Sequence, residues 1–450
     1  MTPQDQQPLR VAFHTLGCRL NQFDTEGIKT ALRNDRPVEV VAWADEADLY
    51  LLNSCTVTGK ADQECRRLAR QVKRRHPEAR VVVAGCYAQT QPTDLQAVPE
   101  IDAVLGNTTK DDIARWLPAV LAGSDEPLVL VEAFPDKLLF DAPVIEEFEG
   151  RSRAFVKVQD GCDLRCSYCL IWQARGPARS CPRDEVLQQI ARLHEEGGYN
   201  ELILTGVDLG RWGKDLADKP RLIDLIRSVS DTHPELRLRL SSIHPNMVTP
   251  ELLALIAERP QLRPHLHISL QSGSDSVLKR MRRPYGREHA LRALDSAAAV
   301  APDFGLGADV IVGFPGESDA EFADTLSMVR DHAFTYLHVF RYSPRPGTEA
   351  ADMPAVHPET VSERSQQLRD LAAAKRLTFL QTLVGQQREA VIEDRDERSP
   401  ARRLATTENY ATVTVDTDLP AGSLVDVSIL SLQDDQLTAR VDRVLRKATP

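Results

Sequence analysis

Three cysteines stand close together in GCDLRCSYCL, at Cys162, Cys166 and Cys169, with the spacing C-x3-C-x2-C. Three thiolates can hold a cubane 4Fe-4S cluster and leave one of its irons without a protein ligand. Such an iron can bind a small molecule through nitrogen and oxygen and then pass it one electron. Zinc with three cysteines and a water is the alternative, but a tight loop directly after a predicted strand favours the cluster.

A second set of three cysteines is spread along the first part of the chain. Cys18, Cys55 and Cys86 lie in TLGC, LNSC and VAGC, and each follows a short apolar run. Such runs are typical of buried parallel strands, whose carboxyl ends open on one edge of a sheet. We therefore expect the three thiols to converge on a second cluster, with three unrelated buried cysteines as the alternative. Cys65 and Cys181 are assigned to neither set.

The elements that position these cysteines begin with an α/β region over residues 8–123. Strands are expected at 11–16, 48–53 and 80–85, with helices between them, which predicts a parallel sheet with right-handed crossovers. The stretch 124–150 is rich in Asp, Glu and Pro, and is predicted to be a linker.

Residues 151–383 repeat a strand and a helix six times, which predicts a partial (β/α)6 barrel with its chemistry on loops at the carboxyl ends of the strands. The cysteine triplet follows the first of these strands. Residues 384–450 change to short alternating runs, which predict a small antiparallel β-barrel that serves either RNA or protein contact. The barrel strands are expected at 154–158, 201–205, 236–240, 265–270, 308–312 and 336–340.

Composition narrows the class of protein. No apolar run approaches the roughly 20 residues of a membrane span, and the start MTPQDQQPLR lacks the layout of a secretory signal. We therefore expect a cytoplasmic protein, in which clustered cysteines favour metal over disulfides. The net charge of −11 argues against non-specific coating of nucleic acid. The basic run Arg66–Arg80 is either a solvated helix face or a local RNA contact.

The triplet and its setting resemble the radical S-adenosylmethionine enzymes, in which the open iron binds the amino and carboxylate groups of S-adenosylmethionine. The resemblance assigns further cofactor contacts to the ends of the barrel strands, where glycines let a ligand approach the backbone. His244 departs from the pattern, since relatives often carry an acidic residue there, and a structural role is its alternative. The candidate cofactor-binding residues are Tyr168, Gly206, Val207, Asp208, Ser242, His244, Gln271, Val312 and Gly313.

Both cysteine sets together resemble a narrower family, the methylthiotransferases, over nearly the whole chain. The resemblance implies a cluster domain, a radical barrel and a C-terminal barrel of the kind called TRAM. It also implies that each cysteine set holds one 4Fe-4S cluster. The stretches that carry it are TLGCRLNQFDTE, NSCTVT, AGCYAQ, HLHISLQSGSDSVLKRMRRPY, ADVIVGFPGE and YLHVFRYSPRPGT.

Within this family, TLGCRLNQFDTE, GVDLGRWGKDL and YLHVFRYSPRPGT are most similar to the branch that acts on N6-threonylcarbamoyladenosine in tRNA. The implied reaction converts this nucleoside, at position 37 next to the anticodon, into its 2-methylthio derivative. One S-adenosylmethionine methylates a sulfur held on the N-terminal cluster, and a second yields the radical that abstracts the C2 hydrogen. No general acid or base is expected, because cofactors carry the hard step.

A bidentate arginine would suit the threonyl carboxylate of that substrate. Arg175 and Arg179, in ARGPARS, are the candidate substrate-binding residues, with ordinary surface arginines as the alternative. The implied partners are the tRNA anticodon stem-loop, a reducing electron donor and a sulfur source. Other functions stay open: methylthiolation of isopentenyladenosine in tRNA or of a ribosomal protein aspartate, or a non-catalytic iron–sulfur protein that binds RNA or carries electrons.

Overall fold

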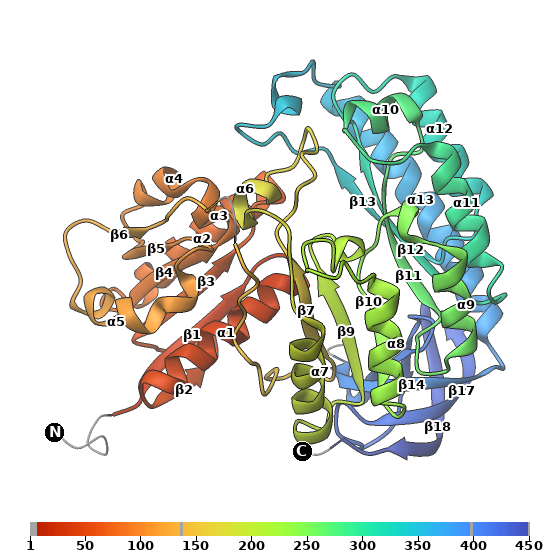
Figure 1. Ribbon diagram of the computed structural model, residues 1–450, viewed down its shortest axis with the longest axis horizontal. Helices are drawn as coiled ribbons and strands as arrows, with labels where there is room; N and C mark the ends of the chain where they lie inside the picture. Colours follow the sequence, from red (N-terminus) through yellow and green to blue (C-terminus); the bar gives the residue numbers. More distant parts are fainter. Residues whose placement is uncertain (1–6, 136–137, 397–398, 449–450) are drawn as a thin grey trace. The chain divides into compact units, whose positions relative to one another are not determined.

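Figure 1 shows the computed structural model, which describes residues 7–135, 138–396 and 399–448. Two predictions reach beyond the described residues: residues 1–6 belong to the start that was predicted to lack a secretory signal, and residues 449–450 to the predicted C-terminal barrel. The side chains of residues 395–401 are also outside the description. The chain divides into two compact units. The first comprises Met1–Ile145, Gln159–Ser180 and Ser343–Thr348, and the second comprises Glu146–Val158, Cys181–Tyr342 and Glu349–Pro450.

A parallel sheet forms the centre of the first unit, and its described strands follow the order β2-β1-β3-β4-β5-β6. Each neighbouring pair runs parallel, which confirms the predicted α/β sheet. The sequence did not predict β2, β5 and β6, because three or four residues are too few to show a period. The strands are β1 (Leu9–Thr15), β2 (Val38–Val41), β3 (Leu49–Ser54), β4 (Arg80–Gly85), β5 (Ala103–Leu105) and β6 (Leu128–Leu130).

Apolar residues on both faces of the strands explain why helices cover this sheet on two sides. One face packs against α2 through Cys65, Leu68 and Val72. The other face packs against α1 and α5 through residues such as Leu32 and Leu117. Thr58 begins α2 by accepting a hydrogen bond from Ala61 N–H. The helices of this unit are α1 (Arg19–Asp35), α2 (Gly59–Arg75), α3 (Cys86–Thr90), α4 (Pro92–Gln96), α5 (Ile113–Ala122) and α6 (Ile171–Arg175).

The second unit carries the strand–helix repeats of the predicted partial barrel. Its strands form one sheet of order β10-β9-β7-β8 and another of order β11-β12-β13. Two isolated parallel bridges, Leu238↔Leu262 and Ile243↔Ile268, continue the pairing from β10 to β11. The last two residues of β7 and all of β8 belong to the first unit. The strands are β7 (Ala154–Asp160), β8 (Arg179–Ser180), β9 (Glu201–Gly206), β10 (Arg237–Leu240), β11 (His265–Gln271), β12 (Gly305–Val312) and β13 (Tyr336–Arg341).

Helices follow these strands in the order that the sequence predicted, and Figure 1 shows α9, α11, α12 and α13 on one side of β11, β12 and β13. Ser318 and Glu321 form a reciprocal capping box that fixes the start of α12. The helices of this unit are α7 (Arg183–Ala191), α8 (Leu222–Thr232), α9 (Pro250–Glu258), α10 (Asp275–Arg280), α11 (Arg287–Ala298), α12 (Asp319–Asp331) and α13 (Pro358–Leu383).

The C-terminal part closes into a barrel of order β14-β15-β16-β18-β17, which confirms the predicted β-barrel. Its pairs are antiparallel as predicted except for β16 with β18, which run parallel. Alternating apolar residues such as Val413 and Val415, and Val425 and Val427, fill its core, together with Leu380 and Leu383 from the end of α13. The strands are β14 (Gln387–Asp396), β15 (Ser399–Thr407), β16 (Thr412–Val415), β17 (Leu424–Gln433) and β18 (Gln436–Arg446).

The predicted boundaries 8–123, 124–150, 151–383 and 384–450 stay predictions, although two observations refine them. The stretch predicted as a linker contributes β6 to the N-terminal sheet. The loop that carries the cysteine triplet belongs to the first compact unit. Within the described ranges, no helix combines the length and the apolar character that a membrane span requires.

Candidate functional site

The set Cys18, Cys55 and Cys86 lies on one edge of the N-terminal sheet. Strands β1, β3 and β4 are adjacent, with Thr15 paired to Asn53 and Ser54 paired to Gly85. Cys18 precedes the first residue of α1, Cys55 directly follows β3, and Cys86 begins α3. The predicted convergence of the strand ends is therefore confirmed, while the role of these thiols as cluster ligands stays a prediction.

Glycine makes room for the sulfur of Cys55. Gly17 has φ +98°, a conformation that side chains with a Cβ rarely adopt. A Cβ built at this position would lie 2.7 Å from the Cys55 sulfur. Gly85, directly before Cys86, has φ +97°, and a Cβ there would collide with the Asn53 amide oxygen. Gly17 thus leaves a cradle for the Cys55 sulfur, and Gly85 lets the chain before Cys86 pass close to Asn53.

Two of the three thiols at this edge, those of Cys55 and Cys86, are buried, whereas Cys18 is exposed. Cys55 and Cys86 are 5% and 2% exposed. Burial raises the pKa of Cys55 to about 12, and the neighbouring Cys86 and Cys18 sulfurs add to the shift. Burial also raises the pKa of Cys86. Several buried thiolates side by side are costly without a cation between them, and soft iron or zinc centres are the cations that thiolates prefer.

Hydrogen-bond donors point at these sulfurs. The N–H of Val57 donates to the Cys55 sulfur over 3.5 Å, and the Asn107 side-chain amide donates to the Cys86 sulfur over 3.5 Å. Donors to cysteine sulfur are a common feature of iron–sulfur sites, where they tune the reduction potential. Burial, cradle and donors together fit a cluster held by Cys18, Cys55 and Cys86.

The set Cys162, Cys166 and Cys169 occupies a loop that is shaped by backbone hydrogen bonds. Cys162 N–H donates to the carbonyl of Gly176 (3.0 Å), and Cys169 N–H donates to that of Cys166 (3.1 Å). Ile171 N–H donates to the Cys169 sulfur over 3.4 Å. Gly161, directly before Cys162, has φ +71°. Cys166 is 7% exposed, and Cys162, Tyr168 and Cys169 are half-buried. Three thiols on one tight loop, open on one side, fit a cluster with a free iron.

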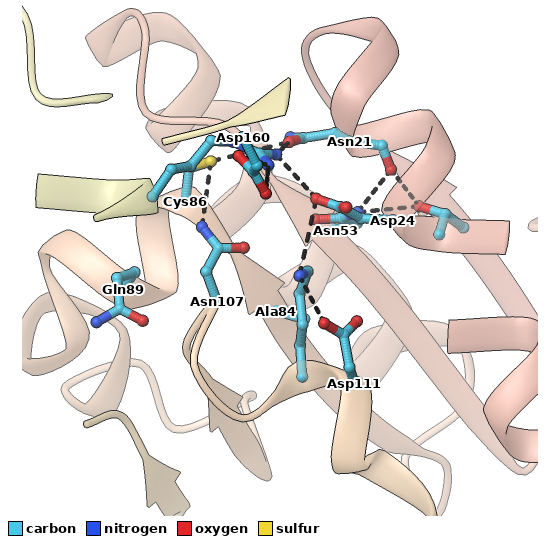
Figure 2. Close-up of polar contacts among 12 residues, drawn as sticks. Asn21, Asp24, Asn53, Ala84, Cys86, Gln89, Asn107, Asp111 and Asp160 are labelled. Atoms are coloured by element: carbon cyan, nitrogen blue, oxygen red, sulfur yellow. Dashed lines mark hydrogen bonds and ion pairs between the residues drawn. The ribbon is translucent and has the colours of Figure 1, made fainter. Parts of the chain in front are cut away.

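A buried network of charges joins this loop to the N-terminal sheet. The Arg175 guanidinium donates to both carboxylate oxygens of Asp160 (3.1 and 3.2 Å) and to Asp24 (2.8 Å). It also donates to the Asn21 side-chain oxygen (2.7 Å), which accepts from the Cys86 thiol over 3.8 Å. Figure 2 shows Asn21, Asp24 and Asp160 gathered beside Cys86.

These contacts favour a structural role for the two predicted substrate-binding residues. Arg175 is only 2% exposed, and carboxylate or amide oxygens already accept from both of its terminal nitrogens. Arg179 is 9% exposed, donates to Asp160 (3.0 Å) and to the carbonyl of Arg175 (2.8 Å), and lies on β8. Donors that are engaged in this way are not available to a substrate carboxylate. Recognition of the substrate's threonyl carboxylate by Arg175 and Arg179 stays an untested prediction.

The other candidate cofactor contacts lie at the carboxyl ends of the strands in the second unit. Gly206 ends β9, Gln271 ends β11 and Val312 ends β12. Val207 and Asp208 follow β9, Ser242 and His244 follow β10, and Gly313 follows β12. In a barrel the carboxyl ends of parallel strands share one rim. This placement agrees with the predicted location of a ligand, and the individual contacts stay predictions.

Two of these strand-end positions are unusual. Gln271 has φ +64°, a strained conformation that tends to occur at functional sites. Burial lowers the pKa of His244 to about 3, and Arg283 and Arg211 add to the shift, so this imidazole is neutral at pH 7. Its Nδ1 lies 3.8 Å from the Asp208 carboxylate. A neutral His244 can hydrogen-bond a polar ligand without adding charge.

The basic run Arg66–Arg80 lies on α2 and the turn after it. Several of its cations form ion pairs with nearby acids, which favours a solvated helix face over a vacant RNA contact. These pairs are Arg67 with Glu64, Arg70 with Glu100, Lys73 with Asp102 and Arg80 with Asp102.

Sequence reasoning missed the residues that support the cysteines. Asn21, Asp24, Asn107 and Asp160 were not singled out. One signal was present: Asn21 and Asp24 are polar residues on the buried side of α1, where apolar residues would be expected. Asn107 and Asp160 carried no such signal, because only the fold brings them to the sulfurs and to Arg175.

Two family models match separate parts of the chain. Residues 156–329 match the family described as Radical SAM superfamily, and residues 10–106 match Uncharacterized protein family UPF0004. The first range holds Cys162, Cys166 and Cys169, and the second holds Cys18, Cys55 and Cys86. The superfamily implies S-adenosylmethionine and a 4Fe-4S cluster as cofactors.

Relatives are similar over most of their length. The chain is 37% identical over 422 residues to the threonylcarbamoyladenosine tRNA methylthiotransferase MtaB of Aquifex aeolicus, covering 94% of this chain and 100% of that protein. It is 36% identical over 418 residues to the tRNA-2-methylthio-N(6)-dimethylallyladenosine synthase of Sorangium cellulosum, covering 86% and 82%.

The fold also occurs in a solved structure, the radical S-adenosylmethionine methyltransferase TsrM from Kitasatospora setae with cobalamin and a [4Fe-4S] cluster bound. The TM-score is 0.55 at 15% identity, over 77% of each chain. At this identity the likeness concerns the fold alone. The relatives and the family model carry the assignment: the chain belongs to the family of threonylcarbamoyladenosine tRNA methylthiotransferases, within the radical S-adenosylmethionine superfamily.

Proposed function

We propose that this protein transfers a methylthio group to C2 of N6-threonylcarbamoyladenosine next to the anticodon of tRNA. The observation that carries the proposal is the pair of three-cysteine sets in one compact unit. The proposal is also supported by a relative: this chain is 37% identical, over 94% of its length, to a threonylcarbamoyladenosine tRNA methylthiotransferase.

Each cysteine set would hold one 4Fe-4S cluster. Cys162, Cys166 and Cys169 would leave an iron open for S-adenosylmethionine, and Cys18, Cys55 and Cys86 would leave one open for the sulfur to be donated. Loaded in this way, the sites supply radical chemistry that can remove hydrogen from an unactivated C–H bond, which no acid or base does at useful rates.

The chain's own residues bind, orient and exclude water. The proposed binding positions for S-adenosylmethionine lie at strand ends and on the cluster loop. They are Gly206 to Asp208, Ser242, His244, Gln271, Val312 and Gly313, with Tyr168 on the cluster loop. Arg175, fixed by Asp24 and Asp160, holds the cluster loop to α1. The burial of Cys55 and Cys86 would limit the access of water to two of the three sulfurs of this set.

The partners follow from the same proposal. They are tRNA, a reducing electron donor and a sulfur source, and the predicted location is the cytoplasm. A second candidate substrate is dimethylallyladenosine in tRNA, because a relative named as a synthase of its 2-methylthio form is 36% identical to this chain.

Mass spectrometry of tRNA nucleosides tests the proposal. Cells that lack the gene should lose the 2-methylthio form of threonylcarbamoyladenosine, and the wild-type gene should restore it. A variant with Cys18, Cys55 and Cys86 changed to alanine should not restore it, whereas Cys65→Ala, which changes a buried cysteine outside both sets, should. Loss of the dimethylallyl product alone would favour the second candidate, and no loss of either would refute both.

A further inference from the structure

Three side chains on neighbouring strands of the second unit form a cluster that the proposed reaction does not use. His267 lies on β11, Asp309 on β12 and His338 on β13. The His267 Nε2 is 2.9 Å from Asp309 Oδ1, and the His338 Nδ1 is 3.1 Å from the same oxygen. The three atoms all lie within 4.8 Å of one another.

Strand register explains why these side chains meet. Asp309 is paired directly with His338, and His267 is paired with Gly307, two residues before Asp309 on the same face of β12. The opposite face, with Leu306, Ala308 and Val310, is fully buried. The cluster therefore stands on a rigid sheet, which holds ligands more firmly than a loop does.

Two of the three separations match those of ligand atoms around one ion, and the third pair of atoms lies within 4.8 Å. Metal–nitrogen and metal–oxygen bonds of about 2.1 Å at right angles put neighbouring ligand atoms about 3.0 Å apart. The separations of 2.9 and 3.1 Å are of this size. Two imidazoles and one carboxylate are a common ligand set for divalent transition metals, and three protein ligands leave positions for water or a substrate oxygen.

A supporting residue orients one of the imidazoles. The Nδ1 of His267 is 2.9 Å from the Tyr336 hydroxyl, so Nε2 is left to face Asp309. Gly307 makes this contact possible, because a Cβ there would collide with the Tyr336 ring. Metal-binding histidines nearly always have such a partner on their second nitrogen.

The cluster is also accessible from one side. The His267 and Asp309 side chains are 7% and 22% exposed, whereas that of His338 is 55% exposed. An ion could therefore enter past His338 and lie against the two more buried ligands. From these observations we propose that His267, Asp309 and His338 bind one divalent transition-metal ion, separate from both cysteine sets.

Cobalt(II) alone is the probe. Full-length protein is loaded with its clusters under anaerobic conditions, and iron is counted to show that the cysteines are occupied. The protein is then dialysed against Co²⁺, and bound cobalt is measured by elemental mass spectrometry. We expect about one cobalt per chain, with binding weakened at least 100-fold in Asp309→Asn and in His338→Ala, and about 10-fold in Tyr336→Phe.

His332→Ala is the matched control. His332 Nδ1 also lies 2.7 Å from a carboxylate, that of Asp295, but among the residues that the structure describes neither belongs to a set of three possible ligands. This variant should keep its cobalt. His338 is largely exposed, so His338→Ala gives a folded variant even where Asp309→Asn does not. Absence of cobalt from the iron-loaded wild type, or unchanged cobalt in His338→Ala, would overturn the proposal and leave Asp309 as a plain acceptor for two imidazole N–H groups.

Discussion

The two cysteine sets are built in opposite ways. Cys162, Cys166 and Cys169 fall within eight consecutive residues, and short backbone hydrogen bonds shape their loop. Cys18, Cys55 and Cys86 are far apart in sequence and meet only because β1, β3 and β4 are adjacent. The contiguous loop is shaped mainly by its own backbone, whereas the dispersed set depends on the adjacency of three strands. The charge network around Arg175 joins the two.

The largest expected effect separates the chemical roles of the two sets. Replacing Cys162, Cys166 and Cys169 by alanine should abolish both the methylthio product and the reductive cleavage of S-adenosylmethionine to 5′-deoxyadenosine. Replacing Cys18, Cys55 and Cys86 should abolish only the product. Chromatography of the reaction mixture measures both compounds. If both variants lose the cleavage of S-adenosylmethionine to the same extent, the proposed division of roles is wrong.

The next effect concerns the charge network around Arg175, which joins the contiguous loop to the helix that follows Cys18. Arg175→Met leaves Asp24 and Asp160 buried without their main cation, which costs about 3 kcal/mol or more. The melting temperature of the loaded protein should fall by several degrees. Arg183→Ala is the control, because its pair with Asp184 is largely exposed and contributes roughly 0–1 kcal/mol. If the two variants have similar melting temperatures, the charge network does not stabilise the protein as proposed.

Part of this comparison could be predicted from sequence and part could not. Strand positions followed from apolar runs, and the convergence of Cys18, Cys55 and Cys86 followed from parallel topology. The network around Arg175 did not, because contacts between residues 24, 160 and 175 depend on packing that no local pattern encodes. For the same reason Arg175 was predicted to meet substrate, whereas its contacts favour an internal role.

A smaller effect is expected at the cradle of the dispersed set. Gly17→Ala forces a residue with a Cβ into φ +98°, at a cost of about 1–2 kcal/mol, and pushes its methyl group against the Cys55 sulfur. The variant should lose iron selectively from the N-terminal site. Gly150→Ala is the matched control, with φ +67° and no atom within 4 Å of the added carbon. Equal iron in both variants would mean that the cradle is not needed.

The smallest effect is expected from one donor to sulfur. Asn107→Ala removes the amide that donates to the Cys86 sulfur, a hydrogen bond of about 1 kcal/mol, so iron should be lost to a chelator about fivefold faster. Gln89→Ala is the control, because the Gln89 amide donates to the carbonyl of Glu132 and not to sulfur. Absorbance of the chelated iron gives the rate, and identical rates would count against a role for this donor.

Iron and acid-labile sulfide counting tests the central claim most directly. Anaerobically prepared wild-type protein should contain about eight irons and a similar amount of sulfide, for two cubanes. Each of the two triple-alanine variants should contain about four. One or two zinc ions in place of iron, or about four irons in the wild type that persist when Cys18, Cys55 and Cys86 are replaced, would contradict the account.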